Sequence, residues 1–359
     1  MKNCSLLPVL ILITVTSHSQ SSNTWYSFWN SDSTLKGFKD GKGFVKIKPR
    51  FTSFIVADKF DNIIAAEEND KKKTNDYYLT KTGRIIGRDS LYLFDLTPDC
   101  ESEGFIRFRN NKNDKVGMFN RNGDVVIPAT YDELSQVTNG LVVALKDAVK
   151  KYMGEHSYWQ GGKTLLIDTS NNLVVPDFDN NNKLDFYSKA ITSILNPDTI
   201  WRNYKTVSSE FISFIDYDKE FKAWLSIFLS QPLTKETLLH SSFNEITLWK
   251  EPEGWVSEPA ADFMDRNFEL IRVKLLGLKS PDCDYFISFD DLNPVIYQKK
   301  QYGKYFNNCD EPKKWKYPLQ QVVINRVENK GLQQDILEFL RTDTGYRLIS
   351  VTIRNGNLK

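Results

Sequence analysis

Histidine, the side chain most often used as a catalytic base, is scarce in this sequence. There are 3 histidines, and because His18 lies in the N-terminal segment, His156 and His240 remain. A histidine-rich metal site is therefore not available, and a Ser-His-Asp or Cys-His arrangement would need one of these two residues. His240 stands beside Ser241 and follows Leu238-Leu239 closely, a setting more typical of a structural histidine than of a base.

Other motifs with known chemistry are missing as well. The sequence contains no Gly-x-Ser-x-Gly, no His-Glu-x-x-His and no phosphate-binding glycine-rich loop. Asp290-Asp291 could serve acid-base chemistry, but neighbouring residues of a strand point to opposite faces, so a loop is the better interpretation. The sequence therefore predicts a protein that is not an enzyme, with no catalytic residue, no cofactor and no metal site.

Two aromatic pairs are candidate ligand contacts. Trp249 and Trp255 stand among three glutamates, at positions 251, 253 and 258. Tryptophan faces can serve as platforms for sugar rings and carboxylates as acceptors, although a surface loop packed by its own aromatics remains the alternative. Tyr158 and Trp159 form the second pair. The expected partner is a protein or an envelope polysaccharide.

The first residues predict a signal peptide. Residues 6–16 form an apolar run that is too short to span a bilayer, and small residues precede Gln20. We expect residues 1–19 to be removed by cleavage between Ser19 and Gln20, with a buried N-terminal strand as the alternative. The mature chain would then reside in the periplasm or outside the cell.

Charge excludes one class of partner. The chain has 359 residues, with 47 Lys and Arg against 46 Asp and Glu, and its net charge is +1. Nucleic-acid binding needs a concentrated positive field, so no nucleic-acid partner is expected. No apolar run after Gln20 is long enough for a membrane span. The length suggests about two domains.

Three cysteines remain after removal of the signal peptide: Cys100, Cys283 and Cys309. An oxidising compartment permits a disulfide. Cys283 with Cys309 is the favoured pair, because both lie in turn-like settings of the second half, and Cys100 would be left without a partner. The alternative is that no pair forms, since three cysteines do not define a disulfide framework.

Between Lys115 and Leu145 the sequence indicates three short strands. Asn122-Gly123 predicts a two-residue hairpin turn in which both residues have positive φ. Pro128 is expected to end the second strand, and Asn139-Gly140 marks the next turn.

Similar phrases recur along the first half. The turn glycines Gly43, Gly83 and Gly123 are about 40 residues apart, an interval that indicates a repeat array. Looser copies of the 115–145 phrase occupy residues 43–66 and 164–176, and the strand that follows Gly104 matches the strand that follows Gly140. We therefore predict a mainly β repeat domain of stacked antiparallel β-hairpin units over residues 20–180.

The 115–145 segment resembles a WG repeat. The positions that carry the resemblance are Val116-Gly117 in place of Trp-Gly, Met118-Phe119-Asn120 in place of Phe-Ile-Asp, Val126-Ile127-Pro128, Tyr131-Asp132 and Gly140-Leu141. The resemblance covers roughly residues 37–177 and implies an all-β repeat domain of secreted and surface proteins, with no assigned catalytic residues. An ordinary antiparallel β-domain with accidental similarity is the alternative.

The second half has a different pattern. A polar stretch at 176–183 marks the boundary, and apolar spacing predicts helices near 184–196 and 208–230. Residues 321–327, 335–341 and 345–353 alternate as three antiparallel strands. We expect residues 184–359 to form an α+β domain with helices packed on a curved antiparallel sheet.

Residues 339–349 are similar to the last hairpin of NTF2-like domains, which implies a cone-shaped fold that can hold a cavity. Two hypotheses follow. The first is an exported, non-enzymatic binding protein that uses a β-repeat surface. The alternative is a hydrolase or isomerase whose site lies in an NTF2-like cavity near Trp224 and Tyr346. A pocket with a desolvated carboxylate or histidine would favour the enzyme, and a cone filled by Phe and Leu would exclude it.

Overall fold

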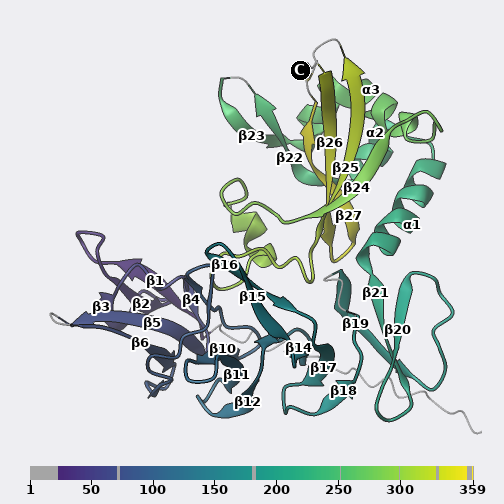
Figure 1. Ribbon diagram of the computed structural model, residues 1–359. Helices are drawn as coiled ribbons and strands as arrows, with labels where there is room; N and C mark the ends of the chain where they lie inside the picture. Colours follow the sequence, from purple (N-terminus) through teal and green to yellow (C-terminus); the bar gives the residue numbers. More distant parts are fainter. Residues whose placement is uncertain are drawn as a thin grey trace, which may run out of the picture.

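A computed structural model describes residues 23–70, 73–179, 183–250, 252–298, 300–328, 331–353 and 358. The predicted signal peptide and its cleavage site lie outside these residues. The protein is mainly β, with many small antiparallel sheets and a few helices (Figure 1). None of the helices in the described part is long and apolar enough to cross a membrane.

Short strands make up the chain as far as residue 216. They are β1 (Trp25–Trp29), β2 (Lys36–Asp40), β3 (Val45–Phe51), β4 (Lys59–Phe60), β5 (Ile63–Asp70), β6 (Lys73–Thr80), β7 (Ile85–Ile86), β8 (Leu93–Phe94), β9 (Thr97–Pro98), β10 (Phe105–Asn110), β11 (Lys115–Asn120), β12 (Val125–Tyr131), β13 (Glu133–Leu134), β14 (Leu141–Lys146), β15 (Val149–Met153), β16 (His156–Gln160), β17 (Lys163–Asp168), β18 (Leu173–Val175), β19 (Leu184–Thr192), β20 (Trp201–Lys205) and β21 (Phe211–Asp216). They pair in small sheets of two to four strands, ordered β3-β2-β1-β4, β5-β6-β7, β8-β9, β10-β11-β12, β13-β14-β17-β18, β15-β16 and β19-β21-β20.

Five hairpins of this region share one register next to the turn. The facing residues are Lys39 and Val45, Leu79 and Ile85, Phe119 and Val125, Ile167 and Leu173, and Lys205 and Phe211. Each turn is closed by the same two backbone hydrogen bonds; in the third, Asn120 N donates to Asp124 O at 3.0 Å and Gly123 N donates to Asn120 O at 2.9 Å.

A left-handed residue occupies the fourth position of every one of these turns. The φ angles are +89° at Gly43, +89° at Gly83, +82° at Gly123, +64° at Asn171 and +70° at Ser209. The hairpin expected at Asn122-Gly123 is present, but only Gly123 of the two has positive φ. The prediction of a two-residue turn is therefore wrong in detail, because the observed bonds are those of a three-residue loop with a left-handed final residue.

Pro128 does not end its strand, contrary to expectation. β12 continues to Tyr131 because the ladder with β11 shifts register between Val116 and Met118. A proline is tolerated at such a bulge, where no backbone donor is needed. Gly117 is a close-approach point of this ladder, since a Cβ there would lie 2.7 Å from the backbone oxygen of Ile127 in β12.

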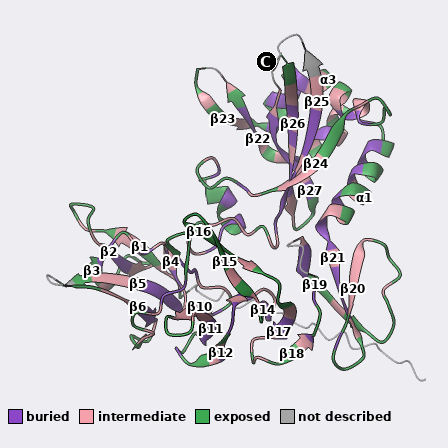
Figure 2. Cartoon of the chain, in the orientation of Figure 1, coloured by how far each residue is buried: buried purple, intermediate pink, exposed green. Residues whose placement is uncertain are grey.

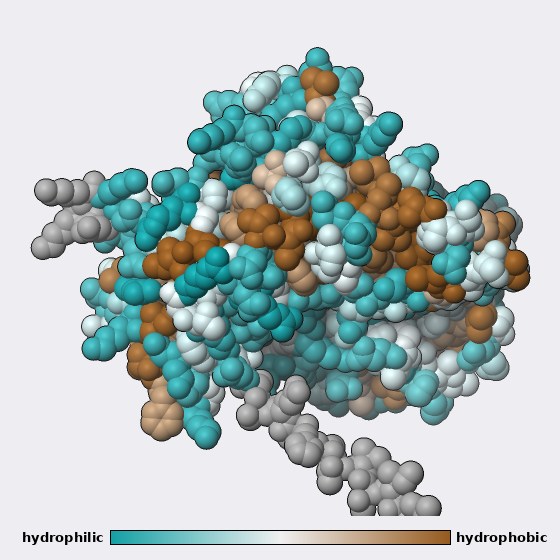
Figure 3. Space-filling model, turned by 90° about the horizontal axis from the view of Figure 1, so that it is seen from below, coloured by the Kyte–Doolittle hydropathy of each residue, from teal (hydrophilic) through white to brown (hydrophobic). Residues whose placement is uncertain are grey.

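The residue that follows each of the first four turns is apolar and exposed. The exposed fractions are 53% for Val45, 40% for Ile85, 54% for Val125 and 40% for Leu173. Figure 3 shows apolar side chains gathered in a broad band across the face seen from below, the side on which β12 and β18 lie in Figure 1.

The helix predicted over 184–196 is wrong, because this segment forms strand β19. β19 pairs with β21, and the register shifts between Asp185 and Ala190. Leu166, Phe186 and Phe214 lie in one apolar cluster, so side chains on both sides of the polar 176–183 stretch share a core.

The second predicted helix begins later than expected. Residues 211–216 form β21, and α1 (Tyr217–Ser230) follows directly. Asp216 is its N-cap, accepting from Asp218 N at 3.0 Å and Lys219 N at 3.3 Å, so the carboxylate satisfies two of the amides that a helix start leaves without partners.

Residues 235–352 supply two further helices and a six-stranded sheet. The elements are α2 (Lys235–His240), β22 (Ser242–Lys250), β23 (Gly254–Pro259), α3 (Ala260–Gly277), β24 (Tyr285–Asp290), the 3-10 helix η1 (Lys300–Tyr305), β25 (Leu319–Glu328), β26 (Gly331–Thr342) and β27 (Gly345–Thr352). The sheet order is β23-β22-β27-β26-β25-β24. The three strands expected at the end of the chain are present and antiparallel, but β22 and β27 pair in parallel, so the sheet is mixed.

Each face of this sheet has its own apolar core. On one face, Phe221 of α1 and Phe263 of α3 lie in a cluster with Leu337 of β26. On the other face, Tyr302 and Tyr317 of the loop between β24 and β25 pack in a second cluster. Figure 2 shows the strands in the middle of the sheet buried between these two layers.

Candidate ligand-binding groove

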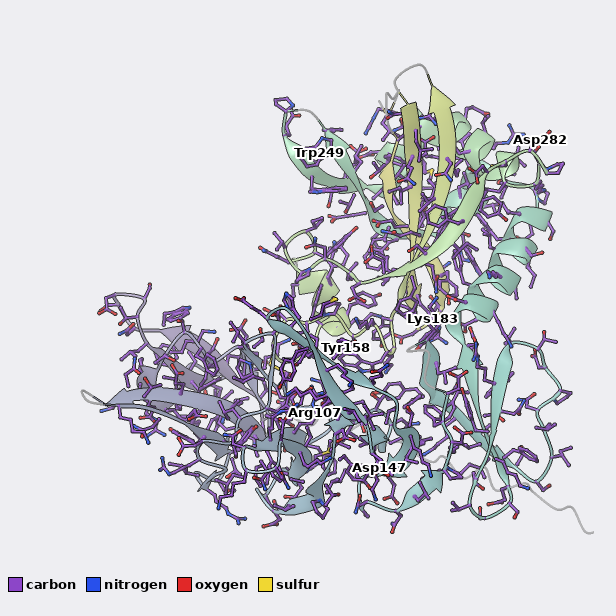
Figure 4. The ribbon with its side chains drawn as sticks, in the orientation of Figure 1. Arg107, Asp147, Tyr158, Lys183, Trp249 and Asp282 are labelled. Atoms are coloured by element: carbon purple, nitrogen blue, oxygen red, sulfur yellow. A yellow bond between two sulfur atoms is a disulfide. The ribbon has the colours of Figure 1, made fainter. Side chains whose placement is uncertain are left out.

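A groove of about 980 Å³ lies where the small sheets meet the six-stranded sheet and its loops. Its described walls come from residues 92–99, 133–143, 183–186, 289–291 and 311–315, with two further side chains given below. We call it the junction groove. Figure 4 shows Lys183 near the junction between the lower and upper parts of the protein and Arg107 within the lower part; both line the groove.

Aromatic rings line both sides of the junction groove. They belong to Tyr92, Phe94, Trp159, Phe186, Phe289 and Trp315. Trp159 is carried by the β15–β16 hairpin, where the Nζ of Lys150 lies 5.5 Å from its ring centroid and forms an ion pair with Asp114 at 2.8 Å. This contact ties the hairpin to the neighbouring β10–β11 turn.

A buried ion pair lies on the wall formed by the small sheets. Arg107 donates from Nη2 to Asp99 Oδ1 at 2.6 Å and from Nε to Oδ2 at 3.1 Å. The Asp99 side chain is 1% exposed and that of Arg107 is 14% exposed. The guanidinium also lies 4.1 Å from the Tyr92 ring centroid, and burial raises the pKa of the Tyr92 hydroxyl. Both charges of this pair are therefore satisfied within the protein.

The other cations of the junction groove are paired too. The Nζ of Lys314 lies 3.0 Å from Oδ2 of Asp291, and the Nζ of Lys183 lies 2.7 Å from Oδ2 of Asp218. The only described lining carboxylates that form no ion pair with a described cation are Asp95, in the β8–β9 turn, and Glu311, whose Oε2 accepts from Asn307 Nδ2 at 2.7 Å. The groove consequently offers carboxylates, but no unpaired cation among its described lining residues.

A disulfide joins Cys100 to Cys309, close in sequence to the groove residues Asp99 and Glu311, with the two Cα atoms 6.2 Å apart. The predicted pair Cys283–Cys309 is therefore wrong, and Cys283 is a free thiol. Sequence proximity favoured that pair, whereas the fold carries the loop before β25 down to the small sheets. Asn308 O there accepts from the amides of Asp58 at 2.8 Å and Lys59 at 3.0 Å.

The bond lies between the two walls of the groove. Asp99 comes directly before Cys100, and Glu311 comes two residues after Cys309. The disulfide therefore fixes the spacing of the segments that carry the groove's carboxylates and Trp315.

The chain matches no protein-family model, no curated protein and no solved structure. The geometry of the site therefore carries the functional argument alone.

The four aromatic residues singled out from the sequence fall in two places. Trp159 lines the junction groove and Tyr158 is its neighbour on β16, with 50% of its side chain exposed. Trp249 and Trp255 face each other across the β22–β23 hairpin, with ring centroids 5.5 Å apart. Figure 4 shows Trp249 at the far end of that hairpin and Tyr158 near the junction. The two pairs do not share a site.

Sequence reasoning missed most of the junction groove. Asp95, Asp99 and Arg107 carried no motif, and Trp315 stands alone in a lysine-rich stretch. The one available signal was Phe94-Asp95-Leu96, two large apolar residues around an aspartate in what reads as a turn.

Proposed function

We propose that this protein is an exported, non-enzymatic binding protein and that its ligand occupies the junction groove. The observation that carries the proposal is the groove itself, with aromatic rings on both sides and its cations already paired within the protein. Its volume lies at the upper end of the roughly 300–1,000 Å³ range of ligand pockets. Concave, aromatic-lined surfaces with a few polar groups bind ligands without needing reactive side chains.

The five hairpins with one register support a repeat architecture of the WG type. Gly117 of Val116-Gly117 lies so close to the β12 backbone that a side chain would clash with it, so a glycine is needed at this position. Neighbouring turns contact each other, since Arg84 forms an ion pair with Asp124 at 2.7 Å. We propose that the repeats continue past the expected boundary near 180, through β20–β21 to Asp216.

The order of elements after Asp216 supports an NTF2-like α+β domain. In such a domain helices pack on a curved sheet, and a strand, a polar turn and an aromatic-led strand form the last hairpin that closes the cone. Here α1, α2, the β22–β23 hairpin, α3 and β24 to β27 follow one another along the chain, and β27 lies beside β22.

The alternative of an enzyme in an NTF2-like cavity finds no support in the packing. The ring centroid of Phe221 lies 4.9 Å from that of Tyr346 and 5.7 Å from that of Phe339, so aromatic rings fill the space between α1 and the sheet. The carboxylate of Glu220 accepts from Arg341 Nε at 2.8 Å and from the Tyr346 hydroxyl at 2.8 Å. These groups satisfy one another and are better explained as structural.

The Cys100–Cys309 disulfide supports export. Disulfides persist in oxidising compartments such as the periplasm and the cell exterior, and are rare in the cytosol. The apolar segment at 6–16 is the matching sequence feature, so we propose that the protein acts outside the cytoplasm.

Tryptophan fluorescence titration tests the binding site. The probes are chitohexaose, cellohexaose and synthetic dodecapeptides of different charge, titrated into the mature protein. Trp159→Ala should weaken binding about tenfold or more, because a lost aromatic anchor costs over about 1 kcal/mol. Trp249→Ala is the matched control and should bind as the wild type does. Loss of binding in Trp249→Ala alone, or an absence of saturable binding to every probe, would contradict the proposal.

A further inference from the structure

We propose that the junction groove binds an extended protein segment that carries lysine or arginine side chains. This inference rests on the proposed binding function and names the class of its ligand. The charges, the rings and the backbone of one turn each contribute to it.

The charges of the groove favour a cationic ligand. The lining contains five carboxylates and three cations: Asp95, Asp99, Glu133, Asp291, Glu311, Arg107, Lys183 and Lys314. Each of the three cations already has a carboxylate partner. Glu133 is paired with Arg109 at 3.2 Å, which leaves Asp95 and Glu311 without a cation among the described residues. An anionic ligand would find no unpaired cation in this lining, whereas a lysine or arginine would meet two available carboxylates.

The aromatic rings suit the same ligand. Indole and phenyl faces attract cations as well as apolar groups, and Trp159 and Trp315 lie in the groove together with Phe94. The protein uses this contact internally, since the Nζ of Lys150 lies 5.5 Å from the Trp159 ring and the guanidinium of Arg107 lies 4.1 Å from Tyr92. A basic side chain of a partner could therefore be held by a ring face and a carboxylate at once.

The β8–β9 turn has the properties of a contact element. Asp95 and Leu96 both adopt left-handed backbone, with φ of +48° and +62°, although neither is glycine. Phe94 is 74% exposed and Leu96 is 82% exposed. A two-residue hairpin turn requires positive φ at both of its central residues, and this backbone is costly here because neither residue is glycine. Phe94 and Leu96 moreover place two neighbouring apolar side chains in water, outside the core. The effect of the turn is to present Phe94 and the Asp95 carboxylate at the groove, an apolar and an acidic contact side by side.

Three matched dodecapeptides test the inference, with four lysines, four glutamines or four glutamates in an otherwise identical Gly, Ser and Leu sequence. Chitohexaose serves as the uncharged non-peptide probe. The lysine peptide should bind at least about tenfold tighter than the glutamine peptide, and the glutamate peptide should not bind measurably. Affinity for the lysine peptide should fall as salt is raised from low to physiological concentration.

Variants locate the effect. The double variant Asp95→Asn, Glu311→Gln should lose about tenfold in affinity for the lysine peptide and most of its salt dependence. Gln at 311 keeps an oxygen to accept from Asn307, so the loop should stay folded, which circular dichroism checks. Glu253→Gln, an exposed carboxylate in the β22–β23 turn, is the control and should change nothing.

The outcomes separate this inference from the proposed function. If the glutamine peptide or chitohexaose binds as tightly as the lysine peptide, and Trp159→Ala weakens that binding, the groove is a binding site but not one for basic segments. If no probe is sensitive to Trp159→Ala, both proposals fail. If the double variant binds the lysine peptide as well as the wild type, the two carboxylates are not the contact.

Discussion

Removal of the Cys100–Cys309 disulfide should lower both the stability of the protein and the order of the junction groove. The two cysteines are 209 residues apart in the sequence. Closing a loop of that length restricts the unfolded chain enough to stabilise the native state by about 5 kcal/mol at 25 °C in the chain-entropy model. Several small sheets have local apolar cores that contain neither cysteine, so we expect a smaller loss of about 2–5 kcal/mol in Cys100→Ser, Cys309→Ser.

Urea unfolding followed by tryptophan fluorescence measures this loss. Cys283→Ser is the matched control, because it removes the free thiol and leaves the disulfide in place. Peptide mapping without reduction should recover the Cys100 and Cys309 peptides as one linked species. The groove should also suffer, since Asp99 and Glu311 flank the bond from opposite walls.

Two results would refute this reasoning. One is a double serine variant that unfolds at the same urea concentration as the oxidised wild type. The other is a linked peptide that contains Cys283, which would show that the loop before β25 does not dock on the small sheets.

Three further substitutions test the packing and the charges. Gly117→Ala should destabilise the protein by about 1–3 kcal/mol, because its Cβ would lie 2.6 Å from the Phe108 ring, and thermal unfolding measures the loss. Asp99→Ala leaves the Arg107 charge buried without its partner and should cost about 3 kcal/mol in urea unfolding. Burial raises the pKa of the Glu338 carboxyl above 4.5, despite a hydrogen bond from Gln321. The folded state disfavours the ionised carboxyl, so the protein loses stability as the pH rises through the folded pKa of Glu338. The urea midpoint of Glu338→Gln should therefore rise relative to that of the wild type between pH 4 and pH 8.

The first two of these have a control in the same chain. Gly277→Ala adds a Cβ with nothing within 4 Å and should be neutral or slightly stabilising. Asp291→Ala breaks an exposed ion pair with Lys314 and should cost under about 1 kcal/mol. A Glu338→Gln variant whose midpoint tracks the wild type at every pH would show that this carboxyl does not titrate differently in the folded state.

The sequence predicts local elements well where a turn residue and alternating strands coincide. The glycines at 43, 83 and 123 marked three hairpins, and Asn139-Gly140 marked a turn in which both residues have positive φ. These positions are readable because few residues tolerate left-handed backbone.

The errors arise where strand irregularity imitates a helix. In β19 the register shift between Asp185 and Ala190 interrupts the alternation of apolar side chains, so their spacing resembles a helical stripe. α3 is not among the predicted helices, although Phe263, Met264, Asn267 and Ile271 are all buried at helical intervals.

The junction groove could not be predicted, because it depends on contacts between distant segments. Its walls come from residues as far apart as Asp95 and Trp315, and the disulfide that holds them joins the two halves of the chain. Neither local propensity nor periodicity encodes such a pairing. Trp159 could be identified because it stands beside Tyr158, and such an aromatic pair can be read directly from the sequence.

The position of β27 has a consequence for the way the protein is made. This strand is inserted between β22 and β26, in the interior of the six-stranded sheet, although it is the last strand in chain order. Until β27 is in place, β22 and β26 each have an edge of unpaired backbone N–H and C=O groups, and the sheet is divided into two parts. A chain delivered from its amino end would therefore leave this sheet incomplete until β27 had followed.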